Sequence, residues 1–213
     1  MSKLIVLIGV LNSGKGYRAE RFIEDNKRFN NEMCHVNFAD EVREMAWAIL
    51  SWRPKNNKEY ENFKNNEIWL NPTFVYYMKT TCKITGRQFL QNLGTRAVRN
   101  KYPNFWADCW LNGFKKAISE GKHVITSDLR FPNELKYTLG LKKDLMFISD
   151  IDKKFIFCDY PSENYNATDP DISERLAQRI LADSFEDGQV IPEDYLTNLL
   201  NDKRFIAQFE KVC

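Results

Sequence analysis

Histidine is scarce in this chain, since its 213 residues include only His35 and His123. A histidine-based metal site or a Ser-His-Asp triad is therefore not expected, and both residues are assigned structural positions at or near strands. The five cysteines are widely separated and form no Cys-x-x-Cys pair. Their odd number and their spacing indicate reduced thiols in a cytosol-like compartment rather than a disulfide framework.

Strong net charge, long apolar runs and low-complexity segments are also absent. The formal net charge of +2 gives no reason to expect binding to nucleic acid or to a membrane surface. No apolar run approaches membrane-spanning length. The run at 4–8 follows Lys3, as in a secretory signal, but it has no small-residue cleavage pattern and leads into a charged amphipathic segment. We therefore expect a cytoplasmic protein without a signal peptide.

What the sequence does contain is a glycine-rich loop after its first apolar run. Residues 3–8 predict a strand, and Gly9-Val-Leu-Asn-Ser-Gly-Lys-Gly16 follows, with Gly9, Gly14 and Lys15 at phosphate-loop spacing. In such a loop the backbone N–H groups surround nucleotide phosphates and the lysine places a positive charge near the β and γ oxygens. The alternative is a plain strand-to-helix turn whose glycines supply positive φ angles.

The residue after the lysine departs from the usual loop. A Ser or Thr normally stands there and offers its hydroxyl to Mg²⁺, whereas this chain has Gly16 followed by Tyr17. Neither residue carries an aliphatic hydroxyl. The loop therefore predicts phosphate binding, and the metal has to be held elsewhere or activity is reduced.

Strand-like and helix-like segments alternate along the chain. We expect strands at 3–8, 33–38, 122–127, 155–158 and 190–191, and helices at 14–26, 40–52, 85–99, 106–119, 173–183 and 193–212. Residues 145–148 are a further strand candidate, either in a hairpin with 155–158 or outside the sheet. This alternation predicts the α/β class, with a mostly parallel five-stranded sheet and helices on both faces.

Two polar segments interrupt this pattern. Residues 55–72 are rich in Asn and Lys and predict an insertion or a mobile cap outside the core. Residues 159–172 are polar and turn-rich, which suits a lid. The whole chain, 1–213, is expected to form one domain. Its core is expected at 1–40 and 120–213, and a helical region at 41–119.

Four polar side chains recur every four residues on the helix expected at 85–99. They are Arg87, Gln91, Thr95 and Arg99. Each step of four overshoots a helical turn by about 40°, so the four form a drifting stripe on one side. Arginine binds phosphate through its planar fork, and glutamine presents a donor and an acceptor to a base edge. The stripe suits a phosphate with a base or sugar; a solvated helix face is the alternative, and it is favoured for Arg99 taken alone.

Single charged residues lie at the expected carboxyl ends of strands, where ligands bind in parallel sheets. Asp128 follows the strand at 122–127, the position from which phosphate-loop enzymes hold Mg²⁺ directly or through water. Its alternative role is to cap the next turn. Arg130 can neutralise the charge of a transferring phosphate, or it can pair with Asp128 or Glu134. Asp40 has a capping alternative as well.

Four segments together resemble the bacteriophage deoxynucleoside monophosphate kinases. In the family's order, they are Gly9-Val-Leu-Asn-Ser-Gly-Lys15, Phe38-Ala-Asp40, Thr85-Gly-Arg-Gln-Phe-Leu-Gln-Asn-Leu-Gly-Thr95 and Asp128-Leu-Arg-Phe-Pro-Asn-Glu134. The resemblance covers most of residues 1–140 and is weaker beyond. There, Ile172-Ser-Glu174 resembles the family's His-x-Ser-Glu segment, with Asp171 in place of the histidine.

The resemblance implies a P-loop nucleoside monophosphate kinase fold, with ATP and Mg²⁺ as cofactors and a deoxynucleoside monophosphate (dNMP) as phosphoryl acceptor. It implies ATP binding by Gly9, Asn12, Ser13, Gly14, Lys15, Gly16 and Tyr17, and dNMP binding by Asp40, Arg87, Gln91, Thr95 and Arg99. Lys15, Asp128 and Arg130 would serve the transfer, and Asp128 would hold Mg²⁺ directly or through water. The region 41–119 would then bind the acceptor. A homodimer is left open, and the compartment would be the host cytoplasm for a phage protein.

Two other functions remain open at this stage. One is a kinase for another small phosphate acceptor, similar to dephospho-coenzyme A kinase. The other is a nucleotide-binding protein with weak or no turnover, for which Gly16 is the main support. A guanine-reading Asn-Lys-x-Asp motif is absent, so a GTPase switch is not favoured.

Overall fold

The computed structural model describes residues 2–10, 13–27, 32–144, 151–158, 179–180 and 185–210. The chain divides into two compact units, which are described separately. Residues 1–38 and 109–212 form the sheet unit, and residues 39–108 form the helical unit. The lid expected at 159–172, the strand candidate at 145–148 and most of the helix expected at 173–183 lie outside the described residues.

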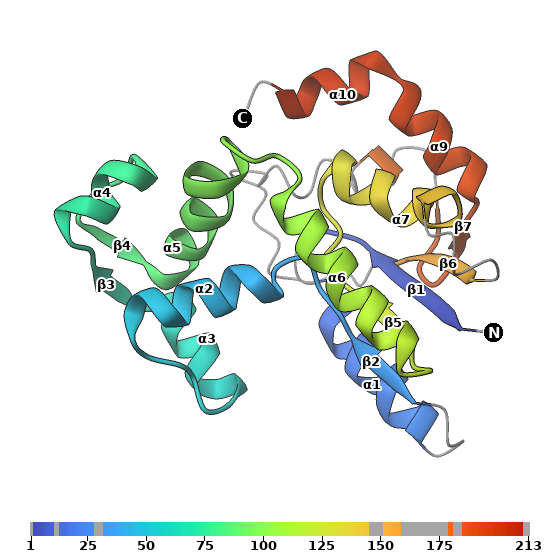
Figure 1. The fold of residues 1–213 in the computed structure, drawn as a ribbon, viewed down its shortest axis with the longest axis horizontal. Helices are drawn as coiled ribbons and strands as arrows, with labels where there is room; N and C mark the ends of the chain where they lie inside the picture. The colour runs from blue at the N-terminus through green and yellow to red at the C-terminus, as the bar shows by residue number, and fades with distance from the viewer. Residues whose placement is uncertain are drawn as a thin grey trace. The chain divides into compact units, whose positions relative to one another are not determined.

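A five-stranded sheet forms the centre of the sheet unit (Figure 1). Its strand order is β2 (Met33–His35), β5 (His123–Thr126), β1 (Lys3–Ile8), β6 (Asp152–Phe157) and β7 (Val190–Ile191). The first four strands run parallel, and β7 pairs with β6 antiparallel. The expected α/β class and mostly parallel five-stranded sheet are thus confirmed.

Strand β1 lies in the middle of this sheet because its sequence is almost entirely apolar. Its residues from Leu4 to Ile8 are all buried. It pairs with β5 on one side and with β6 along its whole length on the other. Successive side chains point to opposite faces, so an unbroken apolar run predicts a strand that is covered on both sides.

Helices cover both faces of the sheet, as expected. On one face, α1 (Lys15–Lys27) packs Ala19 against Leu7 and Ile125. On the other, α6 (Phe105–Ser119) contributes Trp110, whose Nε1–H donates to Thr126 Oγ1 at 3.1 Å. The other described helices of this unit are α7 (Pro132–Asp144), α9 (Glu193–Asn201) and α10 (Lys203–Glu210). Among the described residues, no helix is both long and apolar enough to span a membrane.

The helical unit has its own elements and its own core. In order, they are α2 (Asp40–Leu50), α3 (Asn57–Asn65), β3 (Glu67–Trp69), α4 (Pro72–Met78), β4 (Lys83–Thr85), α5 (Gly86–Asn92) and the π-helix η1 (Leu93–Arg99). Strands β3 and β4 pair antiparallel. A single cluster of buried side chains joins these elements; its largest members are Trp47, Phe63, Phe89 and Trp106.

The prediction that residues 55–72 lie outside the core is wrong. Asn56 caps α3, since its side chain accepts the Glu59 N–H at 3.0 Å. The helix then turns Phe63 into the core with 8% of its surface exposed, and Leu70 is buried after β3. A few well-placed apolar residues anchor the segment, and its polar average composition hides them.

Candidate functional site

The loop after β1 requires glycine at its first position. A Cβ on Gly9 would lie 2.1 Å from the Cys158 carbonyl oxygen and 2.6 Å from Ser13 Oγ. Cys158 follows β6, and its N–H donates to the Ile8 carbonyl at 2.7 Å. The backbone at the end of β6 therefore packs directly against the loop. Gly14 is needed for another reason, because its φ of +73° is a conformation that other residues rarely adopt.

The ammonium group of Lys15 turns back onto the same loop. Its Nζ donates to the carbonyl oxygens of Gly9 at 2.6 Å and Val10 at 2.5 Å, and to Ser13 Oγ at 3.2 Å. Helix α1 begins at Lys15, so the positive end of its dipole lies at the loop as well. Phosphate oxygens can replace the three loop oxygens as acceptors, and the arrangement is therefore suited to an anion.

The other residues assigned to ATP differ in how firmly the structure fixes them. Ser13 is fully buried, and Asn12 lies outside the described residues. Within the described part of the chain, a Cβ on Gly16 would meet no atom within 4 Å, so packing against those residues does not dictate glycine there. Tyr17 is 65% exposed, and its hydroxyl accepts a hydrogen bond from Arg21 at 3.3 Å.

Cys158 packs against this loop as a neutral side chain. Burial raises the pKa of its thiol, although the positive charges of Arg18 and Lys15 act in the opposite direction. Arg18 itself pairs with Asp187 at 2.7 Å, and this hydrogen bond raises the pKa of its guanidinium. A buried neutral thiol is a poor nucleophile, so Cys158 has a packing role.

Asp128 lies at the carboxyl end of β5, the strand that pairs with β1 and β2. Its Oδ1 accepts the Phe38 N–H at 2.9 Å, which ties it to the segment that follows β2. The adjacent Ser127 N–H donates to Asn37 Oδ1 at 3.0 Å, and Ser127 Oγ lies 2.8 Å from His35 Nε2. Polar side chains thus gather at this edge of the sheet, where open parallel sheets bind ligands.

Asn37 was missed in the sequence, where it lies inside the strand expected at 33–38; in the structure β2 ends at His35, and Asn37 follows two residues later at the same edge. For Glu134 the sequence predicts only an ion pair with Arg130. It is 1% exposed, and its Oε2 accepts the backbone N–H groups of Arg130 at 2.8 Å and Phe131 at 3.0 Å. Glu134 therefore fixes the turn that carries Arg130, whose side chain is exposed. A Glu in the first turn after Pro132 is a capping signal that could have revealed this role.

The described residues contain no group of three or more His, Cys, Asp or Glu that could hold a metal ion. This does not conflict with Mg²⁺, which is often bound through one or two carboxylates, several waters and substrate phosphate oxygens. Asp128 supplies a carboxylate at the carboxyl edge of the sheet, where the loop after β1 also begins. The donor set fits a metal that arrives with a nucleotide, and it does not fit a resident all-protein site.

The residues that the resemblance assigns to the acceptor all belong to the helical unit. Asp40 begins α2 and forms an ion pair with Arg43. Arg87 is half-buried and Gln91 is exposed on α5, while Thr95 is half-buried on η1. The residues assigned to the donor and to the transfer, which include Lys15, Asp128 and Arg130, belong to the sheet unit.

The helix that carries this stripe changes type halfway. Thr85 and Gln88 form a capping box at its start, with hydrogen bonds of 3.2 and 2.9 Å. The α-helix ends at Asn92 and continues as the π-helix η1. The i→i+5 bonds of η1 widen the helical turn. The 40° drift per step expected for the stripe therefore does not apply to Thr95 and Arg99. Arg99 is only 7% exposed, and the solvated position favoured for it alone is therefore wrong.

No family model matches the chain, and no curated protein matches it. The function is therefore argued from the geometry of the two units. In the sheet unit, the relevant features are the loop with Lys15 and the neighbouring strand end that carries Asp128. In the helical unit it is the polar side of α5 and η1.

Proposed function

We propose that this chain is an ATP-dependent deoxynucleoside monophosphate kinase of the P-loop type. It would transfer the γ-phosphoryl group of ATP to a dNMP and release a dNDP and ADP. The observation that carries the proposal is the loop after β1. There Lys15 Nζ contacts three loop oxygens within 3.2 Å, and Gly9 has no space for a side chain. The loop follows the central strand of a mostly parallel sheet, and this arrangement supports a fold of the P-loop type.

The sheet unit would bind the phosphoryl donor. Backbone N–H groups of the loop and the Lys15 ammonium group would hold its phosphates, and Asp128 would hold Mg²⁺ directly or through water. Bound Mg²⁺ would neutralise phosphate charge. Arg130 presents an exposed guanidinium from the turn that Glu134 fixes, and it stabilises charge that develops on the transferring group. Little covalent chemistry is required of the protein, because positioning and electrostatics supply most of the rate.

The helical unit would bind the phosphoryl acceptor. Arg87 is suited to the acceptor phosphate through its planar fork. Gln91 is exposed on the same helix, and its amide can donate to and accept from a base edge. Thr95, Arg99 and Asp40 complete the assigned set. This assignment rests on the family resemblance and on the exposure of Gln91.

The test is a coupled ADP-release assay with ATP, Mg²⁺ and every deoxy- and ribonucleoside monophosphate, with dephospho-coenzyme A as a further acceptor. We expect turnover with at least one dNMP, and we expect Lys15→Ala to lower kcat by a factor of about 10² to 10³. Turnover with dephospho-coenzyme A alone would support the other kinase. Tight nucleotide binding without ADP release would support the binding protein.

A variant on the stripe separates the two substrates. Arg87→Ala should raise the KM for the dNMP by more than the KM for ATP. Arg96→Ala is its matched control, because Arg96 lies on η1, is exposed, and donates to the Lys79 carbonyl at 2.8 Å. An equal change in both KM values, or the same effect from Arg96→Ala, would contradict the acceptor role.

A further inference from the structure

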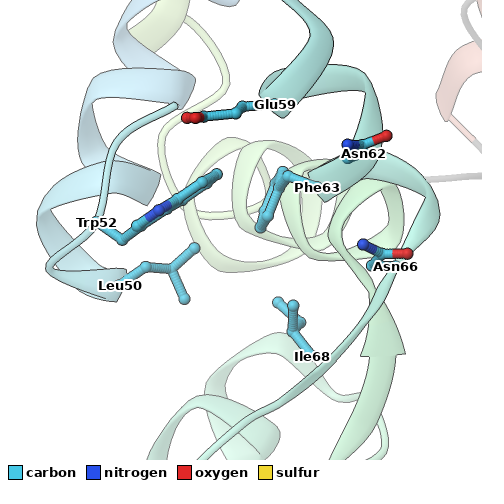
Figure 2. A pocket seen from close by; sticks show the side chains of 7 residues that line it. All are labelled: Leu50, Trp52, Glu59, Asn62, Phe63, Asn66 and Ile68. Atoms are coloured by element: carbon cyan, nitrogen blue, oxygen red, sulfur yellow. The ribbon is translucent and has the colours of Figure 1, made fainter. Parts of the chain in front are cut away.

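The helical unit contains a pocket that the proposed function does not use. Its volume is about 420 Å³, within the range of small-molecule sites. Seven residues line it, namely Leu50, Trp52, Glu59, Asn62, Phe63, Asn66 and Ile68 (Figure 2). They come from the end of α2 and the turn after it, from α3 and its C-cap, and from β3. None of them belongs to the residues assigned to ATP or to the dNMP.

Aromatic rings form one part of the pocket. Trp52 and Phe63 lie with ring centroids 5.5 Å apart and planes inclined by 35°. Trp47 meets both of them edge-on, at 5.7 and 5.2 Å, and holds them in place. The chain reverses at Ser51, which has a φ of +49° and ends α2, so Trp52 folds back beside that helix. Trp52 remains 42% exposed, and part of its ring is available to a ligand.

Polar groups form another part, and Figure 2 shows them along one side of the apolar side chains. Glu59 Oε2 accepts the Lys55 N–H at 2.7 Å, while its Oε1 has no hydrogen-bond partner within the described part of the chain. The side-chain amides of Asn62 and Asn66 have no partner there either. Among the residues that the structure describes, no Lys or Arg lines the pocket. It therefore offers hydrogen bonds and a negative charge, and it offers no cation to a phosphate.

We propose that this pocket binds an uncharged heteroaromatic ring with an amino group on its edge, such as the base of an unphosphorylated adenine or cytosine nucleoside. The ring packs on Trp52, since every base has a face that stacks on an aromatic side chain. Its amino group donates to Glu59, and the two asparagines pair with its other edge atoms. A purely apolar guest, such as a partner's aliphatic side chain, would leave these groups unpaired at a cost in free energy. The proposal does not rest on the kinase function.

The pocket is tested by isothermal titration calorimetry on the full chain with adenosine, cytidine and thymidine, the last having no exocyclic amino group. We expect adenosine or cytidine to bind at least tenfold more tightly than thymidine. Glu59→Gln should weaken this binding about tenfold, because a charged acceptor is lost while the amide oxygen can still accept the Lys55 N–H. The matched control is Glu61→Gln on the same helix, since Glu61 pairs with Lys64 and does not line the pocket.

A second pair of variants probes the stacking face. Trp52→Ala should weaken binding about tenfold, whereas Trp69→Ala, which removes a ring that is 73% exposed outside the pocket, should not. Absence of binding at millimolar nucleoside, equal binding of thymidine, or equal effects within either variant pair would overturn the proposal. Loss of adenosine binding in Arg87→Ala but not in Glu59→Gln would also overturn it, because the nucleoside would then occupy the acceptor site. Inactivity in the kinase assay would leave these results unaffected.

Discussion

At the scale of single residues, Gly16 and Gly9 illustrate two different reasons for a glycine. Gly9 has the Cys158 carbonyl where its Cβ would be, whereas a Cβ on Gly16 would lie within 4 Å of no atom of the residues that the structure describes. Gly9 is thus a requirement of packing. The described residues do not require glycine at position 16, and a Ser there would offer the hydroxyl that usually helps to hold Mg²⁺ in phosphate loops.

Gly16→Ser should therefore increase the proposed kinase activity at limiting Mg²⁺. We expect kcat/KM to rise about tenfold, which corresponds to about 1.4 kcal/mol of transition-state stabilisation. The measurement is ADP release as a function of Mg²⁺ concentration, with Gly16→Ala as the control for the added Cβ. If the Ser and Ala variants behave alike, the missing hydroxyl does not limit this protein.

His123 gives a prediction about pH. Its Nδ1 accepts the Lys3 N–H at 3.1 Å, so the bond requires the neutral ring. Partial burial, and then the charge of Lys3, lower the pKa of His123 below its ordinary value of 6.5. The unfolded chain therefore binds this proton at a higher pH than the folded chain does. Neutral His123 therefore contributes fully to the free energy of unfolding above about pH 6.5. This contribution is lost as the pH falls toward the folded-state pKa.

His123→Asn tests this linkage, because the Asn oxygen can accept a hydrogen bond at any pH in the range. Between pH 7.5 and 5.5, the free energy of unfolding of the wild type should fall more steeply than that of the variant. Urea unfolding at several pH values measures the difference. Parallel pH profiles would show that His123 does not titrate differently in the folded and unfolded states.

At the scale of elements, the indole of Trp106 forms a hydrogen bond to the backbone of the π-helix η1. Trp106 is 1% exposed, and its Nε1–H donates to the Gly94 carbonyl at 2.7 Å. Trp106→Phe keeps an aromatic ring but removes the donor to a partly buried carbonyl, and the lost hydrogen bond should cost about 1 kcal/mol. We expect this loss of stability together with faster amide exchange in residues 93–99, measured by mass spectrometry.

Trp110→Phe is the matched control for this prediction. Trp110 lies one turn further along α6, but its Nε1–H donates to Val36 and Thr126 in the sheet unit. Its removal should speed exchange around β5 and leave η1 protected. Equal exchange of residues 93–99 in both variants would contradict a specific role for Trp106.

The elements that the sequence predicts correctly are those with a clear apolar period. The apolar run of β1 and the spacing of aromatic residues on α6 reveal both elements. The change from α5 to η1 cannot be predicted from the apolar period. The residues that form the i→i+5 hydrogen bonds of η1 are of the same types as those of an α-helix. The same limit applies to the site. Gly9 and Lys15 belong to one local motif, whereas the contact of Asp128 with Phe38 depends on two strands that are 90 residues apart.

At the scale of the whole molecule, the chain leaves the sheet unit once and returns to it once. The helical region expected at 41–119 corresponds to a compact unit of residues 39–108. The boundary at its end could not be located from the pattern, because α6 crosses it with unbroken helical spacing. Each unit has its own buried cluster, one around Phe89 and one around Ile125, and separate cores allow separate unfolding.

Phe89→Ala should therefore destabilise the helical unit selectively. Phe89 is fully buried, and its truncation should cost about 3–5 kcal/mol through lost burial and a residual cavity. Native-state amide exchange should then rise throughout residues 39–108 while β1 and β5 keep their protection. Ile125→Ala, at an equally buried position of the sheet unit, should give the reverse pattern. If both variants expose all the described strands and helices to the same extent, the two cores unfold as one cooperative unit, and the division between them has no thermodynamic counterpart.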